Sequence, residues 1–225
     1  MTDERDKTCP GKPIPSSTVM LLRDGAEGIE TLGVVRNERI SFAGALAFPG
    51  GSLDAGDYLL AAKLIPGDPM APYRVAAIRE VFEETGVLLA QGEERLSDRL
   101  LATLRAELLA GELGFDRLLM EFDLRPALEA LIYFAHWVTP ESYPRRFNAH
   151  FFLADMPRHR RAAHDGGELV ASFWMKPAQV SAWRREGVHI VMPPTEHSCT
   201  LLAGFDSVAQ ARAALAVRQI REVVG

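Results

Sequence analysis

Hydrophobic residues recur at two spacings along this chain, and each spacing predicts a different kind of element. Five segments are rich in Val, Leu, Ile, Thr or Phe and end at turn-prone stretches such as DGAEG at 24–28. Composition and boundaries of this type favour β-strands. The expected strands are 17–23, 29–36, 43–48, 145–154 and 168–175.

Helical spacing is clearest at 73–85, which is followed by the helix-stopping residue Gly86. Long runs of Leu, Ala, Arg and Glu predict two or three amphipathic helices between 95 and 135. A short helix at 57–65 is expected within the loop 52–72. Helices also close the chain: one starts near 176–177, and the last starts at Ser207, where Gln210 stands at the spacing of a capping box.

This order of elements predicts an α/β or α+β sandwich that carries a helical insertion. The length of 225 residues, 48% of them hydrophobic, is sufficient for one large domain. We expect a flexible N-terminus at 1–15 and a single domain at 16–225, with the insertion at about 93–136.

Charge, cysteine content and the absence of long apolar runs indicate which classes of protein this sequence does not fit. The formal net charge of −5 provides no global basic field for nucleic acid, which disfavours RNA decapping. Cys9 and Cys199 lie far apart in a chain without a secretory signal, so both are expected to be reduced thiols. No apolar run approaches the roughly 18–20 residues of a membrane span. The expectation is a soluble, cytoplasmic protein.

The stretch REVFEETGV at 79–87 places Glu80, Glu83 and Glu84 within an arc of roughly 100° on one side of the predicted helix. A solvated acidic surface explains such a pattern, and so does a metal site. Like charges at these spacings repel one another, and Arg79 is the only basic neighbour. All-oxygen ligands suit Mg²⁺ or Mn²⁺, and the PGG turn at 49–51 permits close backbone approach to a ligand. The apolar residues of the helix lie roughly opposite: Val75, Ile78 and Phe82.

AFPGG at 47–51 followed by REVFEETGV at 79–87 resembles the Nudix box. The second half matches the family pattern at every specified position. In the first half Asp57 stands where the family has a glutamate, and 21 residues separate it from Arg79 where the family has seven. An extended box of this kind, together with FPGGSLDAGD and WVTPESYPRRFNAHFFLA, resembles peroxisomal coenzyme A diphosphatase-like Nudix proteins over about residues 17–205.

The resemblance implies an α/β/α sandwich with a mixed β-sheet, in which the box forms a loop–helix–loop. It also implies a set of roles for the box residues. Glu80 and Glu84 match the main metal ligands, and Glu83 matches a glutamate that assists metal binding or orients water. Arg79 matches the arginine that orients a glutamate, and Gly50 matches the glycine whose carbonyl binds a metal. The implied cofactor is Mg²⁺ or Mn²⁺.

The general base varies within the family and often comes from outside the box. Glu168, which follows Gly166-Gly167, resembles a loop glutamate that serves as base in some Nudix enzymes; Glu141 is a second candidate. Arg146 and Arg160 are candidates for binding the substrate phosphates. Each of these residues is equally compatible with an ordinary position on the surface.

The implied reaction is hydrolysis of a nucleoside diphosphate linked to another group, with coenzyme A or acyl-coenzyme A as the leading substrate. ADP-ribose, NADH and nucleotide sugars remain open, as does a catalytically silent Nudix domain that senses a nucleotide. Trp137 or Tyr143 could stack on a base. The helical block could add packing, form a lid or support a homodimer.

Overall fold

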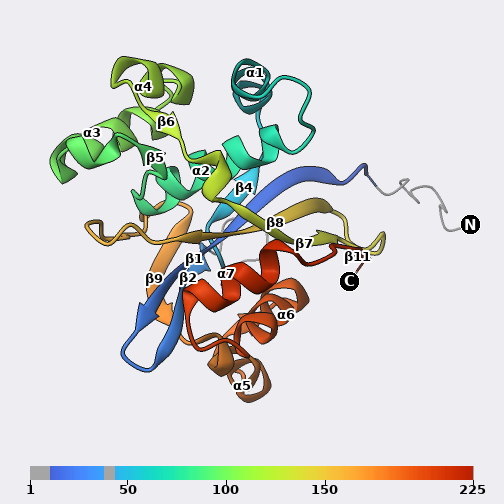
Figure 1. Ribbon diagram of the computed structural model, residues 1–225. Coiled ribbons are helices and arrows are strands. Elements are labelled where there is room, and N and C mark those ends of the chain that lie inside the picture. The colour runs from blue at the N-terminus through green and yellow to red at the C-terminus, as the bar shows by residue number, and fades with distance from the viewer. Residues whose placement is uncertain (1–10, 38–43, 225) are drawn as a thin grey trace, which may run out of the picture.

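A mixed β-sheet forms the centre of the computed structural model, which describes residues 11–37 and 44–224 (Figure 1). Nine strands of these described residues form the sheet. They are β1 (Ile14–Gly25), β2 (Gly28–Arg36), β3 (Ala45–Ala47), β4 (Gly50–Ser52), β7 (Ile132–Val138), β8 (Phe147–Asp155), β9 (Leu169–Met175), β10 (Ile190–Val191) and β11 (Glu222–Val224).

Strand β1 organises the sheet, because it pairs in parallel with β8 and antiparallel with β2 and β4. The main path runs β10-β3-β2-β1-β8-β7-β11, with β9 paired to β2 and β4 paired to β1. The pairing of β4 with β1 places the PGG turn at the centre of the fold, where Gly50 lies opposite Thr18.

Helices cover both faces of the sheet (Figure 1). On one side lie α1 (Ala55–Leu64), α2 (Ala71–Thr85), α3 (Asp98–Leu109) and α4 (Phe115–Glu121). On the other side lie α5 (Val180–Glu186), α6 (Pro193–Leu202) and α7 (Val208–Ala216). Short 3₁₀ turns form at η1 (Glu93–Arg95), η2 (Leu128–Ala130) and η3 (Pro177–Gln179), and β5 (Ala90–Gln91) pairs with β6 (Arg125–Pro126) at the base of the insertion. The expected α/β/α arrangement is confirmed.

The alternation of side chains along β1 explains why both faces are covered. Val19 and Leu21 belong to the core that packs under α1–α4, whereas Met20 and Leu22 belong to the core under α5–α7. All four side chains are almost fully buried. Successive strand residues point to opposite faces, so a strand that is apolar at every position requires a layer on each side.

Helix α2 packs on the sheet through the apolar side predicted from its sequence. Val75, Ile78 and Phe82 have no exposed surface. Gly86 ends the helix with φ of 73°, and its N–H donates to the Phe82 carbonyl. This left-handed conformation favours glycine, as expected for a helix stop. The predicted short helix within 52–72 is also present, as α1.

The expectation of two or three helices between 95 and 135 is wrong for the last part of this range. The insertion contains two helices, α3 and α4, but Ile132–Val138 is strand β7. This segment, IYFAHWV, is rich in β-branched and aromatic residues, and it pairs with β8, placing His136 opposite His150. Pairing within the sheet outweighs the modest helix propensity of the preceding Ala and Leu residues.

Strand β1 begins at Ile14, two residues before the expected start of the domain at residue 16. Cys199 is a free, buried thiol, and burial raises its pKa to about 12. Cys9 and the start of the expected strand 43–48 lie outside the described residues. Among the described residues, none of the helices has the length and apolar content that a membrane crossing needs.

Phe82→Ala should lower the free energy of unfolding by about 3–5 kcal/mol, because it leaves a cavity between α2 and the sheet. Urea denaturation followed by circular dichroism measures the change. Leu59→Ala on α1 is the matched control, because Leu59 is 66% exposed; it should shift stability by less than about 0.5 kcal/mol. Equal effects of the two substitutions would contradict the packing of α2 described above.

Candidate active site

The acidic residues of α2 line a cleft where this helix meets β4. The cleft has a volume of about 430 Å³. Its walls come from the strand ends, from α2, from α3 and from the segment before β9. The lining residues are Arg36, Gly51, Ser52, Arg79, Glu80, Glu83, Glu84, Leu109, Arg145, Phe147, Asp165 and Glu168.

Glu80 and Glu84 are buried, so they do not form a solvated acidic surface. Glu80 is 8% exposed and Glu84 is 3% exposed. The Gly50 N–H donates to Glu84 Oε2 at 2.8 Å. A Cβ atom on Gly51 would lie only 2.4 Å from Glu80 Cδ, so this carboxylate packs directly on the glycine backbone. The PGG turn therefore provides space for both carboxylates.

Burial strongly disfavours the charged forms of these two side chains. It raises the pKa of Glu80 to about 7, although the charge of Arg79 opposes the shift. Burial and the neighbouring Glu80 raise the pKa of Glu84 well above its usual value. The pKa of Glu83 is also raised by burial, but its carboxylate is more exposed and bonds to Arg79. Full ionisation of all three carboxyls would therefore require positive charge beyond that of Arg79.

Arg79 is held by a carboxylate from outside α2. Its Nε and Nη2 donate to the two oxygens of Asp57 at 3.0 and 2.8 Å, and Nη2 also donates to the Ser52 carbonyl. Nη1 then donates to Glu80 Oε1 at 2.9 Å and Glu83 Oε2 at 3.0 Å. Burial alone would lower the pKa of Arg79, but the bond to Asp57 and the surrounding carboxylates raise it above its usual value.

Asp57 also begins helix α1. Its Oδ2 accepts from the Asp54 N–H, and Asp54 Oδ1 accepts from the Asp57 N–H, each at 2.9 Å, which is a capping box. The side chain of Asp57 is buried against Arg79 and does not line the cleft. Asp57 is therefore an anchor for Arg79 and a cap for α1.

The donor set fits a divalent cation. Glu84 Oε1 is buried without a hydrogen-bond partner in the described part of the chain, and Glu80 and Glu84 lie together with few positive charges to offset them. Mg²⁺ commonly uses one or two carboxylates and takes its other ligands from waters and substrate phosphates. Across residues 11–37 and 44–224, no three His, Cys, Asp or Glu side chains form a ready-made coordination shell.

Glu168 reaches the same cleft from the segment before β9. The carboxylate of Asp165 accepts from the N–H groups of Gly167, Glu168 and Leu169 and so fixes this turn. The charge of Glu168 adds to the effect of burial in raising the pKa values of Glu80 and Glu84. Glu141, the second candidate base, does not line the cleft; its carboxylate lies 3.9 Å from Arg146.

The structure does not bring Arg146 or Arg160 into the acidic cleft. Arg146 Nε donates to the Thr139 carbonyl, within the β7–β8 connection. Arg160 donates to the Glu93 carboxylate at 2.6 Å and also to the Asp98 carboxylate and two backbone carbonyls of the insertion. These contacts give both side chains a role in holding the fold together.

The comparison with family models agrees with this geometry. The model described as the NUDT19 Nudix domain matches residues 59–199, which is more than half of the chain and contains the acidic helix. The chain belongs to the Nudix family.

Named Nudix relatives match at moderate identity. Putative nudix hydrolase 7 of Caenorhabditis elegans is 28% identical over 160 residues, covering 70% of this chain and 50% of that protein. Acyl-coenzyme A diphosphatase NUDT19 of Gallus gallus is 29% identical over 185 residues, covering 71% and 48% respectively. This chain thus spans about half the length of these relatives. The crystal structure of a NUDIX hydrolase from Alicyclobacillus acidocaldarius matches with a TM-score of 0.79 at 27% identity, covering 92% of this chain and 99% of that one.

Within the Nudix domain, the extra residues of the box are helical. The stretch between Asp57 and Arg79 contains most of α1 and the start of α2. Leu60 and Ala61 of α1 pack into the same core as α2. The extra stretch of the box therefore forms an additional packed helix, α1. Its two ends meet at the ion pair between Asp57 and Arg79.

Sequence reasoning missed Arg36 and Asp165, which line the acidic cleft of the Nudix domain. Arg36 is the last residue of β2. The sequence indicates its position in the cleft only through the expectation that this strand ends near the PGG turn. Asp165 precedes two glycines, and an Asp-Gly-Gly stretch indicates a side-chain-capped turn. Arg145, the sequence neighbour of Arg146, also lines the cleft, with its guanidinium 5.3 Å from the centre of the Phe147 ring.

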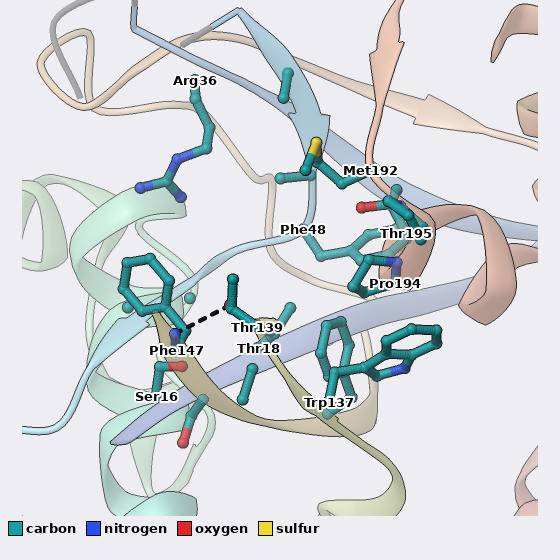
Figure 2. Close-up of a pocket in the computed structure, with 18 of the residues that line it drawn as sticks. Ser16, Thr18, Arg36, Phe48, Trp137, Thr139, Phe147, Met192, Pro194 and Thr195 are labelled. Atoms are coloured by element: carbon teal, nitrogen blue, oxygen red, sulfur yellow. Dashed lines mark hydrogen bonds between the residues drawn. The ribbon is translucent and has the colours of Figure 1, made fainter. Parts of the chain in front are cut away.

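A second, mainly apolar pocket adjoins the acidic cleft and shares Arg36, Gly51 and Phe147 with it (Figure 2). Its volume is about 170 Å³. In Figure 2, Arg36 and Phe147 lie on the left, and Trp137, Pro194 and Thr195 lie on the right. Other walls come from Phe48, Tyr143, Phe151 and Met192.

Gly51→Ala tests the packing of Glu80 on the PGG turn. The added methyl group must displace the Glu80 carboxylate, so the apparent affinity for Mg²⁺ should fall by about tenfold or more. Titration of the melting temperature with Mg²⁺ measures this effect. Gly204→Ala is the control, because a Cβ atom there meets nothing within 4 Å. A Gly51→Ala protein that responds to Mg²⁺ like the wild type would refute the placement of Glu80.

The raised pKa of Glu80 predicts pH-dependent stabilisation by Mg²⁺. Without metal, the protonated carboxyl contributes stability at low pH, and this contribution is lost as pH rises from about 4.5 through about 7. Mg²⁺ replaces the proton, so the rise in melting temperature caused by Mg²⁺ should be greater at pH 8 than at pH 6. The rise is measured as the difference in melting temperature between samples with Mg²⁺ and samples with a chelator, at each pH. Equal shifts at the two pH values would contradict the prediction.

Proposed function

We propose that this chain is a metal-dependent Nudix pyrophosphohydrolase that cleaves a nucleoside diphosphate linked to another group, with coenzyme A or acyl-coenzyme A as the leading substrate. The observation that carries the proposal is the pair of buried carboxylates, Glu80 and Glu84, on the Gly50–Gly51 turn. Only Glu80 of this pair bonds to the Arg79 guanidinium, so burial of both acids is unfavourable for folding alone. Their burial is understandable if a divalent cation and an anionic substrate bind there.

Glu80 and Glu84, assisted by Glu83 and the Gly50 carbonyl, would hold Mg²⁺ or Mn²⁺. The bound cation would supply charge neutralisation on the phosphate oxygens. Arg79 keeps the carboxylates of Glu80 and Glu83 in place through bonds of 2.9 and 3.0 Å. The site thus provides preorganised charge and needs no nucleophilic side chain.

Glu168 is the proposed general base. It lies across the cleft from α2, in a turn fixed by Asp165. Its carboxylate would accept a proton from water while the water oxygen forms a bond to phosphorus and the bond from phosphorus to the bridging oxygen breaks. The products are two phosphate monoesters, and Arg36 and Arg145 lie in the same cleft as candidates to contact their oxygens.

Two observations support the coenzyme A class of substrate. The relative from Gallus gallus is named as an acyl-coenzyme A diphosphatase. The apolar pocket opens beside the acidic cleft, so a substrate with its pyrophosphate on α2 can extend a largely uncharged group between Trp137 and Phe147. Trp137 and Tyr143, the two candidates for stacking on a base, both line this pocket.

A panel of pyrophosphates tests the proposal. Purified protein with Mg²⁺ is incubated with coenzyme A, acyl-coenzyme A, ADP-ribose, NADH, a nucleotide sugar and capped RNA, and products are separated by chromatography. Preferred cleavage of the coenzyme A compounds is expected. Preferred cleavage of another compound would replace the substrate assignment. Binding of a compound, seen as a shift in melting temperature, without turnover of any would favour a nucleotide-sensing domain.

Glu84→Gln should lower kcat by about 10²–10³-fold, because the loss of a metal ligand removes several kcal/mol of charge stabilisation. The amide oxygen can still accept from the Gly50 N–H, so the fold should persist, as circular dichroism would show. Glu121→Gln on α4 is the control, because Glu121 is exposed; its kcat should match the wild type. Near wild-type turnover by the Glu84→Gln protein would exclude the proposed metal site.

A further inference from the structure

The segment that carries Glu168 has no regular secondary structure of its own. Residues 156–168 connect β8 to β9 and contain neither helix nor strand. The last part of the segment is fixed by the Asp165 turn and by Asn37, whose side chain donates to the Gly167 carbonyl and whose N–H donates to the Glu168 carbonyl. The middle of the segment, which turns towards α2, needs other partners.

Two arginines join this segment to the helical insertion, in opposite directions. Arg160 belongs to the segment and donates to Glu93 and Asp98 of the insertion. Arg105 belongs to α3 of the insertion, and its Nη1 donates to the Ala163 carbonyl at 3.1 Å. The insertion is thus attached to the segment on both sides of its midpoint.

Arg105 also binds the end of the helix that carries the acidic residues. Its Nε donates to the Glu83 carbonyl at 2.8 Å. The carbonyl groups of the last helical turn have no partners inside the helix, so an arginine here satisfies one of them. The Thr85 carbonyl accepts from the Ala163 N–H at 2.9 Å. Two contacts therefore hold Ala163 next to α2. Its N–H bonds directly to the helix, and its carbonyl is joined to the helix by Arg105.

The arrangement depends on the shape of the guanidinium group. One planar fork reaches two carbonyls that belong to different elements, which a single ammonium group matches less well. The group also packs closely on the end of α2, since a Cβ atom at Gly86 would lie 3.4 Å from Arg105 Nη1. Burial lowers the pKa of Arg105, while the charges of Asp165 and Glu84 oppose this shift.

We propose that Arg105 is a positioning residue that sets the place of Glu168 relative to the carboxylates of α2, so that the helical insertion is a working part of the active site. The proposal rests on the proposed hydrolase function. Ala163 lies five residues before Glu168, and the intervening turn is fixed by Asp165. A shift of Ala163 therefore acts on the base through this turn, and the bonds from Asn37 to Gly167 and Glu168 limit the movement.

The test compares Arg105→Ala and Arg105→Lys with Arg99→Ala, which removes an exposed arginine from the same helix. Arg105→Ala should lower kcat by about 10–100-fold, because misplacement of a catalytic group by about 1 Å has an effect of this size. The KM and the rise in melting temperature caused by Mg²⁺ should stay near wild type, since the apolar side of α2 still packs on the sheet and Arg79 still holds Glu80 and Glu83. Arg105→Lys should recover part of kcat, and Arg99→Ala should behave like the wild type.

Hydrogen–deuterium exchange of the metal-free proteins provides a readout that is independent of turnover. Residues 157–168 should exchange faster in Arg105→Ala than in the wild type and at an intermediate rate in Arg105→Lys. Unchanged exchange there, or a kcat equal to that of Arg99→Ala, would overturn the proposal. If the wild type hydrolyses nothing in the panel, the hydrolase function fails, and the exchange comparison still decides whether Arg105 fixes the segment. If Arg105→Ala does not fold, Arg105→Lys decides both points.

Discussion

The rest of the site depends on the hydrogen bonds of Arg79, which joins Asp57 to the glutamates of α2. One edge of its guanidinium is held by Asp57 and the other edge holds Glu80 and Glu83. With this anchor, side chains that repel one another keep a common orientation. Arg79 also opposes the effect of burial, so without it the pKa values of Glu80 and Glu83 would be raised further. The fold thus brings several carboxyl groups together, and Arg79 keeps Glu80 and Glu83 from turning away from one another.

The PGG turn provides the space and a hydrogen-bond donor for these carboxylates. Because β4 pairs with β1, the turn is held by the centre of the sheet. Gly50 has φ of 154°, and a side chain there would collide with the Ser17 carbonyl at 2.2 Å. Gly51 leaves space for a carboxylate. Sheet and helix therefore meet at a point where β4 carries no side chain and α2 carries the carboxylates.

Much of this arrangement could be predicted from local sequence. The spacing of Val75, Ile78 and Phe82 identified the buried side of α2, and the Nudix resemblance indicated the layers of the fold, both of which the structure confirms. Strand β7 was assigned to a helix because the Ala- and Leu-rich residues before it favour helix, whereas its own β-branched and aromatic residues pair with the next strand, β8. The acidic residues could be found because one helix carries them, whereas Arg36 and Arg105 join the site through contacts between distant segments.

The contact between Asp57 and Arg79 also closes a loop of the chain. It spans 21 intervening residues, and the shorter box of the family spans seven. Loop-closure entropy grows only with the logarithm of length, so a threefold longer loop costs about 1 kcal/mol more. Burial of Leu60 and Ala61 offsets a cost of this size. The length of this stretch is therefore nearly neutral for stability as long as Asp57 and Arg79 at its two ends remain paired.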